Sequence, residues 1–295
     1  MNKQEKPHIL IVDGMALLFR SFFATSAMGH YFPNDAGVPT NGVQGFARHT
    51  MTAQSLFKPT HMAVCWDMGA HTFRNDLFDG YKANRPAPPE ELVPQFDMAR
   101  NVSELIGWKN YGERGMEADD LIGSLVKAWD GKATITIVTG DKDLLQLLRP
   151  GVEIALIKRG YSEYNIYTED RFIEEYGITP LQYIDKKAFT GDASDGYPGV
   201  KGIGPKTALL LIKKYGSVEG VIEALGELTP RRRQLIEEGM DMLLLSKQLA
   251  EIHCDVDMTD NIEKMETPIY NQLRRELIEK EGYSMIVRQA DSLFI

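Results

Sequence analysis

Three segments with the pattern of buried β-strands are each followed by an aspartate, and this limits the possible folds more than any other feature. The strands are predicted at residues 8–12, 61–66 and 133–139, and the acids are Asp13, Asp67 and Asp141. Helical periodicity separates the strands, which predicts a mostly parallel sheet. Ligands bind at the carboxyl ends of the strands in open α/β sheets, so the three acids should converge on one site.

The strand pattern stops near residue 178, which predicts an α/β domain at 1–178 and an all-helical domain at 179–295. A length of 295 residues is sufficient for two cores. Residues 69–94 break the helical periodicity and are rich in proline, which predicts an exposed, partly helical excursion. A hairpin-like pair is expected at 152–158 and 161–168. Further helices are expected at 15–28, 43–57, 96–106, 117–129, 180–189, 205–215, 217–225, 230–248 and 268–281.

No stretch of the sequence has the length and apolar character of a membrane span or a signal peptide. The apolar run near the N-terminus covers only residues 9–12. The two cysteines, Cys65 and Cys254, lie far apart in the sequence, which is typical of a reducing compartment. We therefore expect a cytoplasmic protein with no membrane partner, and Cys65 should be buried in its strand.

Further acids follow the strand-end aspartates in two clusters. Glu117, Asp119 and Asp120 begin a predicted helix, Asp143 follows Asp141, and Asp192 and Asp195 lie in the loop GDASDG. These nine carboxylates would repel one another in one cleft unless cations neutralised them. An all-oxygen site suits Mg²⁺ or Mn²⁺. Two such ions, about 4 Å apart, can promote phosphodiester hydrolysis.

Each of these acids also has a purely structural interpretation. An aspartate after a strand is commonly a turn or helix cap, and acids at 117–120 favour a helix N-terminus. On a helical wheel Asp120 falls nearly opposite the apolar face, which makes it the weakest ligand candidate of that helix. Capping does not require acids at three strand ends and in two loops, so their joint occurrence favours the cation site.

The net charge of −9 excludes a chain that binds nucleic acid purely as a polycation, so any such site must be a local basic patch. Residues 179–216 hold six lysines and three acids around the turn GVKGIGPK. Closely spaced glycines let backbone N–H groups approach a phosphate, and the helix that begins at Pro205 adds its positive end. The alternative is a plain helical turn with solvated lysines.

Residues 70–90 interleave basic and aromatic side chains, which suits a single nucleic-acid strand. The basic residues are Arg74, Lys82 and Arg85, and the aromatic residues are Phe73, Phe78 and Tyr81. On a helix, Lys82 and Arg85 would share a face. A solvated surface helix is an equal alternative.

The motifs together resemble the structure-specific 5′-nuclease (flap endonuclease) family. That family includes the 5′-nuclease domain of bacterial DNA polymerase I and stand-alone bacterial and phage 5′–3′ exonucleases. The motifs are LIVDG at 10–14, Asp67 with TFRNDLFDGYKANR at 72–85, EADD at 117–120, TGDKD at 139–143 and GDASDGYPGVKGIGPKTA at 191–208. The resemblance implies a PIN-like α/β domain with a helical arch at about 70–106. It implies that a DNA-binding helix–three-turn–helix follows at about 185–216.

The resemblance also implies a free-standing, monomeric, divalent-metal-dependent nuclease of replication and repair. It would hydrolyse 5′ flaps and 5′ ends of branched or 5′-ended duplex DNA, and RNA primers in RNA–DNA hybrids. The first Mg²⁺ would be held by Asp13, Asp67, Glu117, Asp119 and Asp120, and the second by Asp141, Asp143, Asp192 and Asp195. Asp141 would lie between the two ions, and Mn²⁺ would be able to substitute.

Carried over in the same way, the catalytic residues would be Lys82, Arg85, Asp119 and Asp141. The DNA-binding residues would be Arg74, Tyr81, Lys82, Arg85, Lys201, Gly202, Ile203, Gly204, Lys206 and Thr207. Main-chain carbonyls of the turn at 202–204 would bind K⁺. The chain departs from the family pattern at Gly196, where Asn is usual. Loss of that amide would loosen the loop of the second ion.

Two functions of other classes compete with this prediction. The first is a protein that binds branched DNA without cutting it, which a missing metal-site acid would favour, and none is missing. The second is a phosphotransferase that uses Asp141-Lys142-Asp143 as a phosphoaspartyl motif, although such a motif usually follows the first strand. Cleavage of a 5′-flap duplex and trapping of a phosphoaspartate would separate the three.

Overall fold

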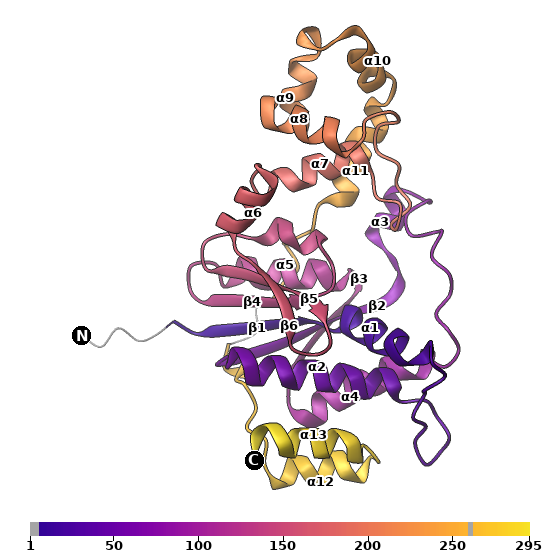
Figure 1. The fold of residues 1–295 in the computed structure, drawn as a ribbon, viewed down its shortest axis with the longest axis vertical. Coiled ribbons are helices and arrows are strands. Elements are labelled where there is room, and N and C mark those ends of the chain that lie inside the picture. Colours follow the sequence, from indigo (N-terminus) through magenta and orange to yellow (C-terminus); the bar gives the residue numbers. More distant parts are fainter. Residues whose placement is uncertain (1–5, 259–261) are drawn as a thin grey trace, which may run out of the picture.

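The computed structural model describes residues 6–258 and 262–295, and its centre is one six-stranded sheet with helices on both faces (Figure 1). The strands are β1 His8–Asp13, β2 His61–Thr72, β3 Lys109–Gly115, β4 Thr134–Thr139, β5 Val152–Arg159 and β6 Glu163–Tyr167. They lie in the order β3-β2-β1-β4-β5-β6, and all neighbours are parallel except β5 and β6. The predicted mostly parallel sheet and the hairpin at its edge are confirmed.

The helices divide into two covering layers, a module beyond the sheet and a C-terminal pair (Figure 1). The α-helices are α1 Gly14–Ser26, α2 Asn41–Phe57, α3 Phe73–Leu77, α4 Val93–Ile106, α5 Ala118–Ala128, α6 Glu169–Tyr176, α7 Gln182–Thr190, α8 Pro205–Tyr215, α9 Val218–Glu223, α10 Pro230–Glu238, α11 Met240–Ala250, α12 Gln272–Lys280 and α13 Ser284–Phe294. Short 3₁₀ helices are η1 Asp143–Leu147, η2 Leu225–Glu227 and η3 Ile262–Met265. None of the helices in the described ranges is long and apolar enough to cross a membrane.

Strand β1 supplies both cores of the sheet domain. Ile9 and Ile11 pack in the core that includes the apolar face of α5, whereas Leu10 and Val12 pack in the core with α1, α2 and α4. Successive side chains of a strand point to opposite faces, and all four are fully buried. Burial on both faces explains why this strand is a continuous apolar run rather than an alternating one. Cys65 of β2 is also fully buried, as predicted.

The excursion after β2 contains less helix than the expected arch at 70–106. Strand β2 continues to Thr72, α3 is only five residues long, and hydrogen-bonded turns follow before α4 begins at Val93. Lys82 has a left-handed backbone, with φ of 55°. Lys82 and Arg85 therefore do not share a helical face, because the chain between them is a turn.

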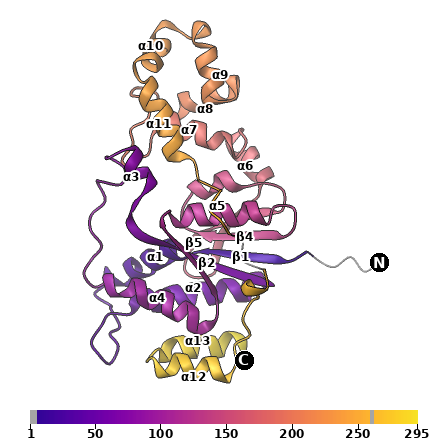
Figure 2. The ribbon, with the colours of Figure 1, turned by 180° about the vertical axis from the view of Figure 1, so that it is seen from behind.

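The C-terminal helices do not belong to the helical module, in contrast to the expected domain at 179–295. Helices α7 to α11 form the module at one end, while α12 packs against α4 and α13 against α2 at the other end (Figure 2). Ile286, Val287 and Ala290 of α13 are buried in the core that α2 lines. The apolar face of α13 thus completes the sheet domain.

Candidate active site

The three strand-end acids converge at one edge of the sheet. Strands β2, β1 and β4 are parallel neighbours. Asp13 ends β1, and Asp141 lies two residues beyond β4. Asp67 lies within β2, two residues past Cys65, which pairs with Asp13 at the end of β1. All three line a cavity of about 230 Å³ together with Glu117 and Asp119. The expectation that acids following parallel strands converge on one site is therefore matched by a cavity.

Main-chain and side-chain donors fix the carboxylates of Asp13 and Asp67. Asp13 is the N-cap of α1: its Oδ1 accepts from the Ala16 N–H at 2.9 Å, and its Oδ2 accepts from the Thr139 hydroxyl at 2.7 Å. Asp67 Oδ1 accepts from the Ala118 N–H at 2.6 Å. The capping interpretation and the site interpretation thus both apply to Asp13, because a cap also orients a carboxylate.

Asp120 does not face this cavity, although it was expected among the ligands. Its two oxygens accept from the Arg74 guanidinium at 2.8 and 2.9 Å, and from the N–H groups of Glu117 and His253. Arg74, expected to contact DNA, has 2% of its surface exposed, and Asp120 has none. The two residues neutralise each other in the interior. Asp120 lines neither cavity of the site, and the guanidinium of Arg74 is directed at Asp120 and Glu117 rather than at solvent.

Glu117 is held from two sides by residues of the excursion. Its Oε2 accepts from the Tyr81 hydroxyl at 3.2 Å, and its Oε1 accepts from the Lys82 Nζ at 2.8 Å. Tyr81 is 2% exposed, so its ring is not available to stack on a base. Lys82 and Arg85 do line the cavity, as one basic wall of an acidic cleft.

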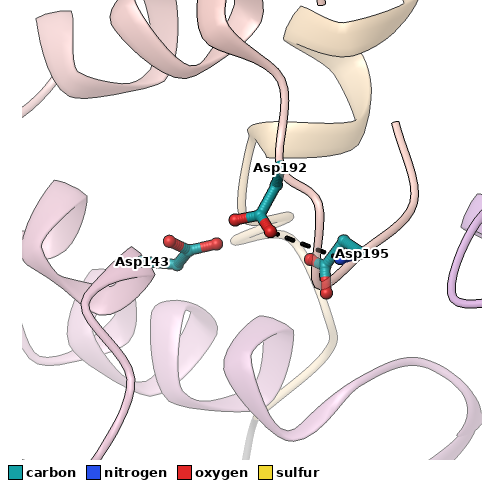
Figure 3. Close-up of side chains that lie close together, drawn as sticks. All are labelled: Asp143, Asp192 and Asp195. Carbon is teal, nitrogen blue, oxygen red and sulfur yellow. Dashed lines mark hydrogen bonds between the residues drawn. The ribbon is translucent and has the colours of Figure 1, made fainter. Parts of the chain in front are cut away.

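A second group of acids lies beside the first. Asp143, Asp192 and Asp195 each place one carboxylate oxygen within 4.8 Å of those of the other two (Figure 3). The Asp195 N–H donates to Asp192 Oδ1. The Asp143 N–H donates to Asp141 Oδ1 at 2.8 Å, which links this group to the first. A second, small cavity is lined by Asp119, Asp141, Asp143 and Asp195, so the two groups are continuous.

Lys187 is a site residue that the sequence patterns did not reveal. Its Nζ donates to Asp143, and to Asp192 at 2.8 Å, and the residue is 5% exposed. In the sequence it counts as one of the basic-patch lysines, and nothing in its spacing indicates a buried partner. Arg85 pairs with Asp195 at 2.6 Å, so two basic side chains offset the charge of the second group.

Burial, with a smaller contribution from neighbouring acids, raises the pKa values of several acids of the cleft. Burial raises the pKa of Asp13 to about 7 and that of Asp143 to about 6, and it raises the pKa of Asp119 well above its ordinary range. Neighbouring aspartates add to each of these increases. Burial alone would also raise the pKa of Asp192, but hydrogen bonds from Lys187 and Ser194 outweigh this effect and lower the pKa to about 2. An all-carboxylate donor set with raised pKa values fits hard divalent cations.

The Asp119→Asn variant should be more stable than the wild type in EDTA. Because burial raises the pKa of Asp119, ionisation of this residue destabilises the fold, so the free energy of unfolding falls as the pH rises above the ordinary aspartate pKa of about 4. We expect the melting temperature of the variant at pH 8 to exceed the wild-type value by about 3 °C, since 1 kcal/mol corresponds to roughly 2–4 °C in domains of 150–250 residues. The difference should shrink at pH 5. A less stable variant at pH 8 would contradict the crowded-carboxylate interpretation.

The turn between α7 and α8 presents backbone and lysines to solvent. Lys201, Gly202, Gly204 and Lys206 are exposed, and Thr207 is half-buried. Ile203 is 4% exposed, so it offers only its main chain to a ligand. Helix α8 begins at Pro205. The basic surface is smaller than the sequence suggests, because Lys187 points into the acidic cleft.

The fold and cleft define an α/β protein with an acidic cleft beside a helical module. A family model described as "5'-3' exonuclease, N-terminal resolvase-like domain" matches residues 8–177, and one described as "5'-3' exonuclease, C-terminal SAM fold" matches residues 178–272. A 5'-3' exonuclease of Bacillus subtilis (strain 168) is 47% identical over 97% of this chain and 96% of its own length. The chain belongs to the 5′–3′ exonuclease family.

DNA polymerase I of the same organism is 37% identical over 97% of this chain, which spans only 32% of the polymerase. Among solved structures, the T5 D15 protein co-crystallised with metal ions superimposes with a TM-score of 0.70 at 19% identity, over 97% of this chain and 98% of that one. The catalytic core of Rad2 in complex with DNA substrate superimposes with a TM-score of 0.58 at 13% identity, over 99% and 93%. These structures share the fold described here.

Proposed function

We propose that the chain is a divalent-metal-dependent 5′–3′ exonuclease and 5′-flap endonuclease that hydrolyses DNA phosphodiester bonds in replication and repair. The observation that carries this proposal is the acidic cleft beside the carboxyl ends of β1 and β4 and the middle of β2, whose wall holds Lys82 and Arg85. Membership of the exonuclease family supports it. The acidic side chains suit the binding of cations and the basic side chains suit the binding of a phosphate, so together they fit phosphodiester hydrolysis.

The carboxylates divide into two ligand sets. We assign Asp13, Asp67, Glu117 and Asp119 to one Mg²⁺, and Asp143, Asp192 and Asp195 to a second, with Asp141 between them. Mn²⁺ has the same preference for oxygen and should substitute. Ions bound there would activate water and stabilise charge on the leaving oxygen. Asp120 is left out of the set, because it is fully buried against Arg74 and lines neither cavity.

The basic wall of the cleft has a separate role. Lys82 and Arg85 would contact the scissile phosphate and hold it beside Asp119 and Asp141, two of the three acids that line both cavities. Arg74 and Tyr81 would act as positioning residues behind them, because Arg74 binds Asp120 and Tyr81 binds Glu117.

The turn at 201–207 would bind the duplex through its phosphates, with K⁺ held by main-chain carbonyls of residues 202–204. The exposed glycines, Lys201, Lys206 and the start of α8 support this. Phosphates are common to RNA and DNA backbones, so we also propose an RNA–DNA hybrid as a second substrate. We further propose a monomer that acts in the cytoplasm, which the two free thiols Cys65 and Cys254 support.

Lys206→Gln should weaken duplex binding with little effect on turnover at saturating DNA. Loss of one phosphate contact should reduce the slope of log K against log[salt] by about 0.9. Fluorescence anisotropy with a labelled duplex in EDTA at several salt concentrations measures this slope. Lys264→Gln, on η3, is a control of equal charge change. An unchanged slope for Lys206→Gln would remove that residue from the interface.

The proposed function is tested by incubating the protein with a labelled 5′-flap duplex in Mg²⁺ or in EDTA. Metal-dependent release of the flap at the junction is the expected result. Binding without cleavage in Mg²⁺ and in Mn²⁺ would refute the nuclease and favour a protein that binds branched DNA. Repeating the assay with an RNA flap strand and with Na⁺ in place of K⁺ tests the hybrid substrate and the monovalent ion.

A further inference from the structure

Residues 80–85, which we term the strap, lie directly on residues 191–196, which we term the acid loop. Three consecutive carbonyl oxygens of the acid loop accept hydrogen bonds from the strap. Asp195 O accepts from the Lys82 N–H at 2.7 Å, Ala193 O from the Asn84 side chain at 2.8 Å, and Ser194 O from Arg85 Nε at 3.3 Å. The two segments are more than 100 residues apart in the sequence, and their contact joins the sheet domain to the helical module.

Gly196 lies at the closest point of this contact. Its φ is +81°, and a Cβ built there would lie 2.5 Å from the Gly80 carbonyl oxygen and 3.4 Å from Asn84 Oδ1. The left-handed backbone alone would tolerate asparagine, which visits that region more readily than most residues. The backbone oxygen of Gly80 would not tolerate any side chain at 2.5 Å. The close contact, and not the backbone angle alone, therefore requires glycine.

The docked strap sets the position of both basic residues of the cleft. Lys82 adopts its left-handed backbone there and reaches Glu117 in the first acid group, while Arg85 reaches Asp195 in the second. Both side chains line both cavities. A strap that lifted from the acid loop would carry these two charges away from the cleft.

We propose that Gly196 is a positioning residue: its lack of a side chain lets the strap dock on the acid loop, and this docking holds Lys82 and Arg85 over the cleft. The consequence for catalysis rests on the proposed nuclease function, whereas the docking does not. This gives a role to the glycine at a position where the related sequence pattern has asparagine. In this chain the strap and the acid loop act as one unit.

Hydrogen–deuterium exchange of the full chain, without DNA and in EDTA, tests the docking. Gly196→Asn should raise the exchange rate of the strap amides at least tenfold, most clearly at Lys82, whose N–H bonds to Asp195 O. Gly160→Asn is the matched control: Gly160 has a φ of +58°, and a Cβ there meets nothing within 4 Å. The control carries the same kind of backbone strain without a contact, so its strap should exchange at the wild-type rate.

Flap cleavage under saturating DNA tests the positioning role. Gly196→Asn should lower kcat at least tenfold while the affinity for an unbranched duplex stays within twofold, because the duplex-binding turn is unchanged. Asn84→Ala removes one strap bond without backbone strain and should shift exchange and kcat in the same direction by less. It replaces Gly196→Asn if that variant does not fold.

Wild-type exchange of the strap in Gly196→Asn, or equally fast exchange in Gly160→Asn, would overturn the docking proposal. Fast exchange with an unchanged kcat would overturn the positioning role. If the wild-type protein fails to cleave DNA, the nuclease proposal fails, and exchange alone still decides whether Gly196 docks the strap.

Discussion

Asp119→Asn is expected to reduce cleavage at least a thousandfold while leaving DNA affinity within about twofold. Asp119 lines both cavities of the acidic cleft, so its charge contributes to both proposed cation sites. A loss of about 4 kcal/mol in transition-state stabilisation corresponds to roughly a thousandfold in rate. Single-turnover cleavage of a 5′-flap duplex in Mg²⁺ measures the rate, and anisotropy in EDTA measures the affinity.

The same substitution should stabilise the metal-free fold and abolish the reaction, and these opposite effects distinguish a functional acid from a structural one. Asp97→Asn is a suitable control, because Asp97 is an exposed acid on α4 that pairs only with Arg100 in the described contacts. Its turnover should match the wild type. Wild-type turnover in Asp119→Asn would contradict the assignment of the cleft.

The position of the cleft was predictable because buried parallel strands are visible in a sequence. Residues 8–12 are a nearly continuous apolar run, and residues 133–139 combine β-branched apolar residues with threonines; both strands are buried on both faces. The acids that follow such strands then meet at one edge. Strand β3 was not predicted, because its residues, KNYGERG, form a half-exposed edge strand in which apolar and polar residues do not alternate.

The partners of individual charges were not predictable in the same way. Sequence spacing places Asp120 near Glu117 and Asp119, but it carries no information on a guanidinium 46 positions earlier. The side chains of Lys187 and Lys206 look alike in the sequence, yet one is buried among aspartates and the other is exposed. Likewise, nothing in the sequence pattern indicates that α13 packs on α2. Periodicity fixes local structure, whereas pairing depends on the assembled fold.

Arg74→Met is expected to destabilise the protein by about 3–5 kcal/mol, because it leaves the carboxylate of Asp120 charged and buried without its partner. Arg74 also donates to the carbonyl oxygens of Leu249 and Glu251, so it ties the excursion and α5 to the end of the helical module. The loss is a large part of a typical unfolding free energy of about 5–15 kcal/mol. The shift of the urea unfolding midpoint measures it.

Two further variants test whether the loss of stability comes from the buried Arg74–Asp120 pair rather than from the removal of any arginine. Arg233→Met removes an exposed i,i+4 pair with Glu237 and should hardly change the midpoint, because solvent screens such pairs. Adding Asp120→Asn to Arg74→Met removes the unpaired charge while an amide oxygen still caps α5, so the double variant should be more stable than Arg74→Met alone. A double variant no more stable than the single one would show that packing of the Arg74 stem, and not the buried charge, sets the cost. The pair would then contribute through packing in the interior rather than through its charges.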